Sequence, residues 1–179
     1  MNYAIVFSSV TGNTAQLAER LAAVLPKESG AYFGAPSPEA AQADLILAGF
    51  WTDKGACSKG MAEFLESLHN KQVFLFGTAG FGGSEAYFAQ ILDRVRIHLD
   101  PSNQVISTFM CQGKMPPSVR ARYETLLEQQ PQKMGELIQN YDRALSHPDE
   151  ADLAELERRA LPLKEIIREG MAMCSGIMF

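Results

Sequence analysis

The sequence predicts an α/β protein in which a parallel sheet carries helices on both faces. Short apolar runs alternate with amphipathic helical segments over residues 3–130, and right-handed crossovers between successive strands make such a sheet parallel. The runs are apolar at almost every position, as in strands that are buried on both faces. A length of 179 residues suits one domain, so residues 1–179 are expected to form a single unit with its core over residues 1–130.

The first strand and helix are predicted within residues 3–25. Residues 3–7 (YAIVF) form an apolar run, and from Leu17 onward apolar residues recur at helical spacing. Between them lies the segment 8–14, in which five of seven residues carry a hydroxyl or amide side chain. A loop of this composition at the start of a helix indicates an anion site.

The physical reason is that the N–H groups of a first helical turn have no intrahelical partner. They form the positive end of the helix dipole, which attracts an anion. Gly12 permits a tight backbone turn, while Ser9, Thr11 and Thr14 can donate hydroxyl hydrogen bonds to phosphate oxygens. No Lys or Arg precedes Arg20, which favours a phosphate monoester held by neutral donors. The loop lacks the Gly-Lys-Ser/Thr motif of P-loop nucleoside triphosphatases, which argues against an NTPase. A simple polar turn that caps the helix is the alternative interpretation.

The remaining elements follow the same alternation. Further strands are expected at residues 31–33, 44–49, 72–77 and 104–111, and further helices at 58–70, 85–98, 117–129, 134–146 and 149–170, with a short helix or turn after Ser37. Pro162 is expected to cause a kink or a new helix start. Ligands of such sheets bind beyond the carboxyl ends of the strands, so the loops 8–14, 50–57, 78–84 and 111–117 are expected to converge on one ligand.

The motif Ser-x-Thr-Gly-Asn-Thr after a first strand resembles the phosphate loop of the flavodoxin family. The resemblance covers residues 3–130. It implies a five-stranded sheet in the order 2-1-3-4-5, FMN as the cofactor, and an electron carrier rather than a stand-alone enzyme. Carried over residue by residue, the implied phosphate contacts are Ser9, Val10, Thr11, Gly12, Asn13 and Thr14.

Two further loops are expected to hold the flavin ring. Phe50, Trp51 and Thr52 follow the third strand, and Trp51, the only tryptophan, is predicted to stack on one face of the ring. A local loop anchor is the alternative role for Trp51.

The glycine-rich loop after the fourth strand offers Thr78, Ala79, Gly80 and Phe81. Its backbone N–H groups are expected at the pyrimidine edge of the ring and Phe81 at the other face. A flexible connector before a helix that Ser84 caps is the alternative.

Two departures from the family pattern concern the cover of the ring. Many flavodoxins have Thr-Trp where this chain has Trp51-Thr52, and Glu85 stands near the position of the usual second aromatic residue. One flavin face is therefore expected either to be less covered or to be covered by Phe81. An uncovered face would admit a substrate or nicotinamide.

The segments GFWTDKGAC, LFGTAGFGGS and CQGKMPP further resemble a smaller group of flavodoxin-like proteins of anaerobic bacteria. This resemblance implies a role in assisting bilirubin reduction by a partner reductase. The expected function is therefore electron transfer through FMN in the service of a redox partner protein. Two alternatives stay open: an NAD(P)H-dependent FMN quinone-type reductase, and a flavodoxin-fold interaction module without flavin.

Composition and charge narrow the function classes. A net charge of −5, without a basic patch, argues against nucleic-acid binding as a main role, and no apolar run reaches transmembrane length. The three cysteines lie far apart without a CxxC motif or zinc-ligand spacing. They indicate free thiols in a reducing compartment, so a cytoplasmic protein without a membrane partner or metal is expected.

About 50 residues after Pro131 exceed the five-strand plan, and they are expected to form a C-terminal helical extension over residues 131–179. This extension has three possible roles: it wraps the domain, it makes a homodimer contact, or it docks a partner. Its last residues, 171–179, are apolar and rich in Met, which is typical either of packing on the chain's own domain or of an adaptable interface.

Overall fold

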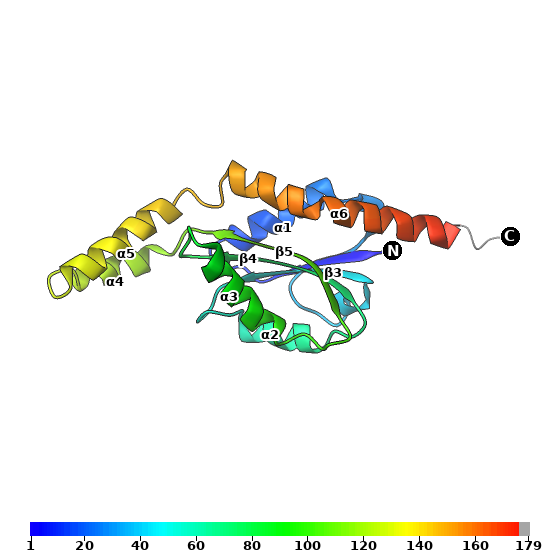
Figure 1. The fold of residues 1–179 in the computed structure, drawn as a ribbon, viewed down its shortest axis with the longest axis horizontal. Helices are drawn as coiled ribbons and strands as arrows, with labels where there is room; N and C mark the ends of the chain where they lie inside the picture. Colours follow the sequence, from blue (N-terminus) through cyan, green and yellow to red (C-terminus); the bar gives the residue numbers. More distant parts are fainter. Residues whose placement is uncertain (176–179) are drawn as a thin grey trace.

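The computed structural model describes residues 1–175. These residues form one five-stranded sheet in the order β2-β1-β3-β4-β5 (Figure 1), and all four strand pairs are parallel. The fold class and the strand order expected from the sequence are thus confirmed. The strands are β1 (Tyr3–Phe7), β2 (Gly30–Gly34), β3 (Leu45–Trp51), β4 (Gln72–Ala79) and β5 (Gln104–Gln112).

Helices cover both faces of the sheet, with α1 and α6 on one face and α2 and α3 on the other (Figure 1). In β3, for example, Leu45 and Leu47 belong to the core under α1 and α6, whereas Ile46 and Ala48 belong to the core under α2 and α3. The central strands β1 and β3 are apolar because both of their faces are buried, whereas the edge strands β2 and β5 are more exposed. The helices are α1 (Asn13–Val24), α2 (Lys59–Glu66), α3 (Glu85–Arg96), α4 (Pro117–Thr125), α5 (Pro131–Ala144) and α6 (Glu150–Ser175), with short 3-10 turns at Lys27–Ser29 and Ala40–Gln42.

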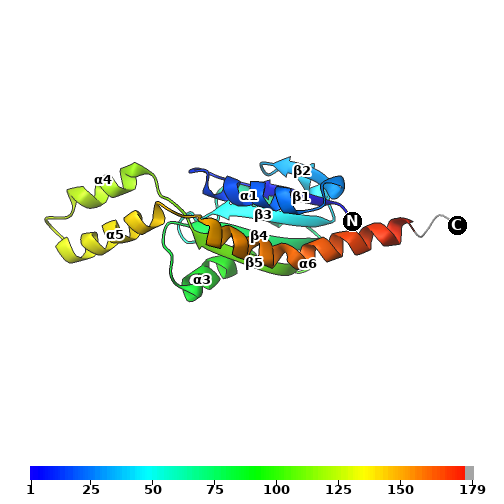
Figure 2. The ribbon, with the colours of Figure 1, turned by 90° about the horizontal axis from the view of Figure 1, so that it is seen from above.

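The helix α6 packs along α1 on its own domain (Figures 1 and 2). Its buried side chains recur every three or four residues and join the core of that face: Leu153, Leu156, Ala160, Leu163 and Ile167. At its start, Arg20 of α1 pairs with Glu150 (Nη2–Oε2 2.8 Å) and Glu157 (Nη1–Oε1 2.9 Å). This part of the C-terminal extension therefore wraps the domain, which is one of the three roles that the sequence left open.

Pro162 lies inside α6 and does not start a new helix. Figure 2 shows the axis of α6 changing direction near its middle, as expected where a proline removes a backbone hydrogen bond. Within residues 1–175, no helix is both long and apolar enough to span a bilayer. The expectation for the Met-rich end of the chain lies outside the part that the structure describes.

The helices α4 and α5 form a hairpin that projects away from the sheet (Figures 1 and 2). The two helices pack on each other around Tyr123, Met134 and Tyr141, and Arg120 of α4 donates from Nε to Asp142 Oδ1 of α5 at 3.1 Å. Both helices were expected from the sequence, although α5 begins earlier than predicted, at Pro131. Its last turns return to the sheet.

The buried thiols give a prediction about reactivity. Cys57 and Cys111 are both buried and free, and burial raises the pKa of each thiol above its ordinary value. Neither should react with iodoacetamide at pH 8 in the folded protein, whereas both should react in denaturant. Peptide mass spectrometry after timed alkylation checks this, and rapid labelling of either residue in the native state would contradict it.

Candidate functional site

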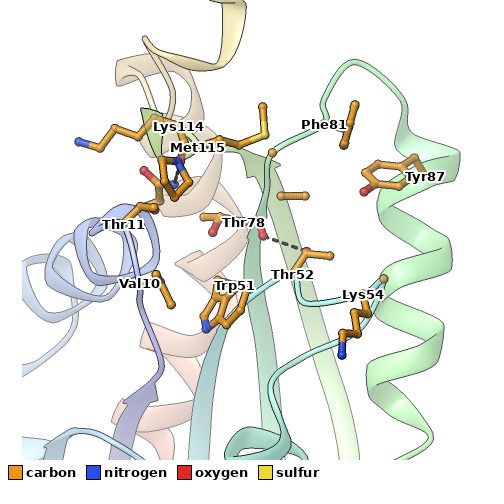
Figure 3. Close-up of a pocket in the computed structure, with 16 residues that line it drawn as sticks. Val10, Thr11, Trp51, Thr52, Lys54, Thr78, Phe81, Tyr87, Lys114 and Met115 are labelled. Carbon is orange, nitrogen blue, oxygen red and sulfur yellow. Dashed lines mark hydrogen bonds between the residues drawn. The ribbon is translucent and has the colours of Figure 1, made fainter. Parts of the chain in front are cut away.

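A cavity of about 350 Å³ lies beyond the carboxyl ends of the strands (Figure 3). All four loops that follow β1, β3, β4 and β5 line it, as the topology of the sheet predicts. Nine of the thirteen site residues predicted from the sequence are among its lining residues: Val10, Thr11, Asn13, Trp51, Thr52, Thr78, Ala79, Gly80 and Phe81.

The other four predicted site residues do not line the cavity. Ser9 Oγ accepts a hydrogen bond from the Ala15 N–H at 3.2 Å and thus supports the first turn of α1, while Gly12 is exposed as the N-cap of α1 with φ of 86°. Thr14 is fully buried, and its Oγ1 lies 3.1 Å from Thr78 Oγ1. Thr14 therefore links α1 to the end of β4.

Phe50 corrects the prediction for the third loop. The strand β3 extends to Trp51, and Phe50 is fully buried in the core under α2 and α3. Its ring packs so closely on Gly77 that a Cβ there would lie 2.7 Å from Phe50 Cζ. Because neighbouring strand residues point to opposite faces, Phe50 enters the core and is not a plate of the cavity, while Trp51 lines it.

Seven further residues that the sequence did not single out line the cavity. Six lie in the expected loops 50–57 and 111–117, and one lies on α3: Lys54, Gly55, Gly113, Lys114, Met115, Pro116 and Tyr87. Lys54 and Gly55 form a tight turn with positive φ (49° and 83°), closed by two backbone hydrogen bonds of 2.9 Å between Asp53 and Ala56. The usual Asn-Gly signal of such a turn is absent here, so the sequence did not reveal it.

Aromatic side chains stand on different sides of the cavity. Figure 3 shows Trp51 at one side and the pair Phe81 and Tyr87 at another. The rings of this pair meet edge to face with centroids 6.4 Å apart, and burial raises the pKa of the Tyr87 phenol, which stays protonated. A flat, apolar ligand would find faces to pack against on both sides.

The start of α1 is tied to the loop after β5. Asn13 Nδ2 donates to the Lys114 carbonyl at 2.8 Å, and a Cβ on Gly113 would collide with this amide. Among residues 1–175, Asn13 Oδ1 and Ser8 Oγ are buried without a hydrogen-bond partner. A buried polar group without a partner costs about 1–3 kcal/mol.

The charge around the cavity differs from that of the whole chain. The chain carries a net charge of −5, yet none of the sixteen lining residues is acidic, and Lys54 and Lys114 are exposed at its edge. Among the described residues neither ammonium group makes an ion pair. The sequence predicts an anion site with neutral donors alone, and the structure adds Lys114 to the lining of the same cavity. Lys114 follows β5 and lies a hundred residues beyond the phosphate loop in sequence.

The cluster of His147, Asp149 and Asp152 brings three possible metal-ligand groups within 4.8 Å of one another. Its contacts are those of a helix cap: Asp149 N–H donates to Asp152 Oδ2 and Asp152 N–H to Asp149 Oδ1, each at 2.9 Å. His147 Nδ1 lies 2.6 Å from Asp152 Oδ2. The cluster is accounted for by the start of α6.

Comparison with known proteins agrees with this architecture. The family model described as the flavodoxin domain matches residues 4–160. The flavodoxin-like domain-containing protein BilS of Clostridium symbiosum is 39% identical over 176 residues, covering 88% of this chain and 93% of that protein. The protein of the same name from Clostridioides difficile is 29% identical over 164 residues, covering 87% and 92%.

Solved structures show the same fold at low sequence identity. Oxidised flavodoxin 2 from Bacillus cereus superposes with a TM-score of 0.54 at 15% identity, covering 92% of this chain and 99% of that one. An archaeal flavodoxin gives a TM-score of 0.50 at 14% identity, covering 94% and 99%. With the family match over most of the chain, these findings show that the chain belongs to the flavodoxin family.

Proposed function

We propose that this protein binds FMN in the cavity of Figure 3 and carries electrons for a partner oxidoreductase. The observation that carries the proposal is the convergence of the α1 loop, two aromatic walls and a glycine-rich loop on one cavity at the strand ends. When bound, FMN supplies the redox chemistry, and the protein supplies binding and orientation.

The residues present fit this cofactor. The N-terminal turn of α1 and Thr11 would hold the phosphate, with Lys114 as a nearby cation. Trp51 and Phe81 would pack on the ring. The orphaned Asn13 Oδ1 is an acceptor suited to a ribityl hydroxyl. The site thus offers a group for each part of the molecule.

The lining of the cavity favours a carrier over an enzyme with its own acid–base chemistry. None of the sixteen lining residues is Asp, Glu, His or Cys, and the titratable side chains of the lining are Lys54, Lys114 and Tyr87, so the carboxylates and imidazoles that most often transfer protons are missing beside the proposed ring. The protein would bind and shield the cofactor and leave substrate chemistry to its partner. A reductase that acts on bilirubin is the partner that the sequence resemblance implies.

The exposure of two lining residues is also compatible with a reductase that acts on its own substrate. Phe81 is 39% exposed and Val10 is 65% exposed, so the cavity is open on one side, as an NAD(P)H-dependent quinone-type reductase would need.

Titration of flavin-free protein with FMN, followed by flavin fluorescence and visible absorbance, tests the proposal. Saturable quenching with one FMN per chain is expected. A protein that shows neither change would be an interaction module without flavin. With bound FMN, reduction only when a separate reductase is added supports the carrier, whereas steady NADPH consumption with a quinone and no partner would support the alternative.

A further inference from the structure

The α4–α5 hairpin reaches back into the wall of the cavity through Asn140. This residue lies near the end of α5, is 8% exposed, and donates from Nδ2 to the Gly80 carbonyl at 3.0 Å. Gly80 belongs to the glycine-rich loop that lines the cavity. A helix outside the minimal five-strand plan therefore holds the backbone of the proposed ring-binding loop.

Gln112 at the end of β5 closes a ring of hydrogen bonds with these two residues. Its Nε2 donates to the Gly80 carbonyl at 3.0 Å and to Asn140 Oδ1 at 3.1 Å. The Gly80 oxygen thus accepts from two side-chain amides, one from the sheet and one from the hairpin. Mutually hydrogen-bonded, part-buried amides hold one another in a single geometry, and the loss of one removes two of the three hydrogen bonds.

Close packing restrains the loop as well. A Cβ on Gly82 would lie 2.5 Å from Gln112 Oε1, and a Cβ on Gly80 would lie 2.5 Å from Met115 Sδ. The segment after α5 also holds the neighbouring loop, because the Lys114 N–H donates to the His147 carbonyl at 3.1 Å. Asn140 in α5 and His147 just after it are therefore bonded to the two loops on this side of the cavity.

We propose that Asn140 and Gln112 form an amide clamp, a pair of positioning residues that fixes residues 79–83 in the conformation the ligand meets. The clamp holds the backbone of the loop in place before any ligand arrives. The clamp contacts the glycine-rich loop and not the phosphate loop. Because the glycine-rich loop is the one proposed to contact the flavin ring, the clamp should affect the binding of the ring and not of the phosphate. The part of the proposal that concerns flavin rests on the proposed function, whereas the clamp itself can be tested without flavin.

The first test is limited proteolysis of flavin-free protein with chymotrypsin, which cleaves after the partly exposed Phe81. Asn140→Ala is expected to speed cleavage at this bond about tenfold, because a local opening that is more favourable by 1.4 kcal/mol is ten times more populated. Gln139→Ala is the matched control, since Gln139 is an exposed amide on the same helix. It should leave the rate unchanged. Mass spectrometry identifies the cleaved bond.

A second variant guards against global unfolding. Asn140→Asp keeps the shape and the acceptor for Gln112 but replaces the donor that serves the Gly80 carbonyl, so it should also speed cleavage after Phe81. In a Gln112→Ala background the effect of Asn140→Ala should shrink, because the hydrogen bond from Gln112 that orients the Asn140 amide is already absent. Unchanged cleavage in both Asn140 variants, or equal effects of Asn140→Ala and Gln139→Ala, would overturn the clamp.

The second test of the clamp measures the affinity for flavins. Asn140→Ala is expected to weaken FMN and riboflavin by the same factor, about tenfold, because the clamp acts on the ring side. A loss confined to FMN, or no loss, would overturn the positioning role. If the wild-type protein binds neither flavin, the proposed function fails while the cleavage experiment still decides on the clamp.

Discussion

Leu156→Ala is expected to lower the free energy of unfolding by about 2–5 kcal/mol, the usual range for a leucine removed from a packed core. Leu156 is fully buried on α6 and belongs to the core cluster that also contains Leu17 and Leu21 of α1 and Phe109 of β5. The truncation leaves a cavity between the extension and the sheet. Urea unfolding of flavin-free protein measures the loss without the added stability of a bound ligand.

Leu161→Ala is the matched control for this experiment. It removes the same atoms from the same helix, but Leu161 is 53% exposed, so a change within about 0.5 kcal/mol is expected. Similar losses in the two variants would mean that α6 does not pack on the sheet in solution. A large difference establishes the extension as part of the hydrophobic core.

Trp51→Ala is expected to weaken FMN and riboflavin equally, by about 10- to 100-fold, because an aromatic plate contributes about 1–3 kcal/mol to stacking on a flat ring. Both ligands carry the same ring, so the affinity for each should fall by the same factor. Trp51 lines the cavity at the end of β3. Fluorescence titration with each ligand, and with Trp51→Phe as a partial restoration, measures the effect.

Thr11→Ala is the phosphate-side counterpart and should weaken FMN about tenfold while leaving riboflavin unchanged, since a hydrogen bond to a charged group contributes about 1.5–3 kcal/mol. Thr11 lines the cavity in the loop before α1. The opposite pattern, in which Trp51→Ala affects only FMN or Thr11→Ala affects both ligands, would place the phosphate and the ring elsewhere.

Local patterns in the sequence were sufficient for the fold and for much of the site. Continuous apolar runs mark buried parallel strands, and the carboxyl ends of such strands meet at one edge. The cavity lies at this edge and is lined by the four loops that follow those strands. The polar loop around Thr11 and the glycine-rich loop around Gly80 were both found in this way.

Contacts between distant segments decided the rest. Phe50 and Trp51 are adjacent aromatic residues, and only the extent of β3 and the pleat of the strand settle that Phe50 enters the core while Trp51 lines the cavity. Thr14 carries the right chemistry for a phosphate contact, but its hydroxyl meets Thr78 instead. Composition does not reveal such a pairing, because it depends on the distance between two elements.

By itself, the sequence determined the class of the fold, the order of its elements and the edge of the sheet at which the cavity lies, since these follow from periodicity and the handedness of crossovers. Tertiary structure alone decided that the charged C-terminal helix belongs to the core, that Lys114 lies beside the phosphate loop, and that Asn140 holds Gly80. Each of these contacts joins segments that are far apart in the sequence, as Asn140 and Gly80 are at 60 residues, and no local pattern encodes such a contact because it arises only when the packed elements meet.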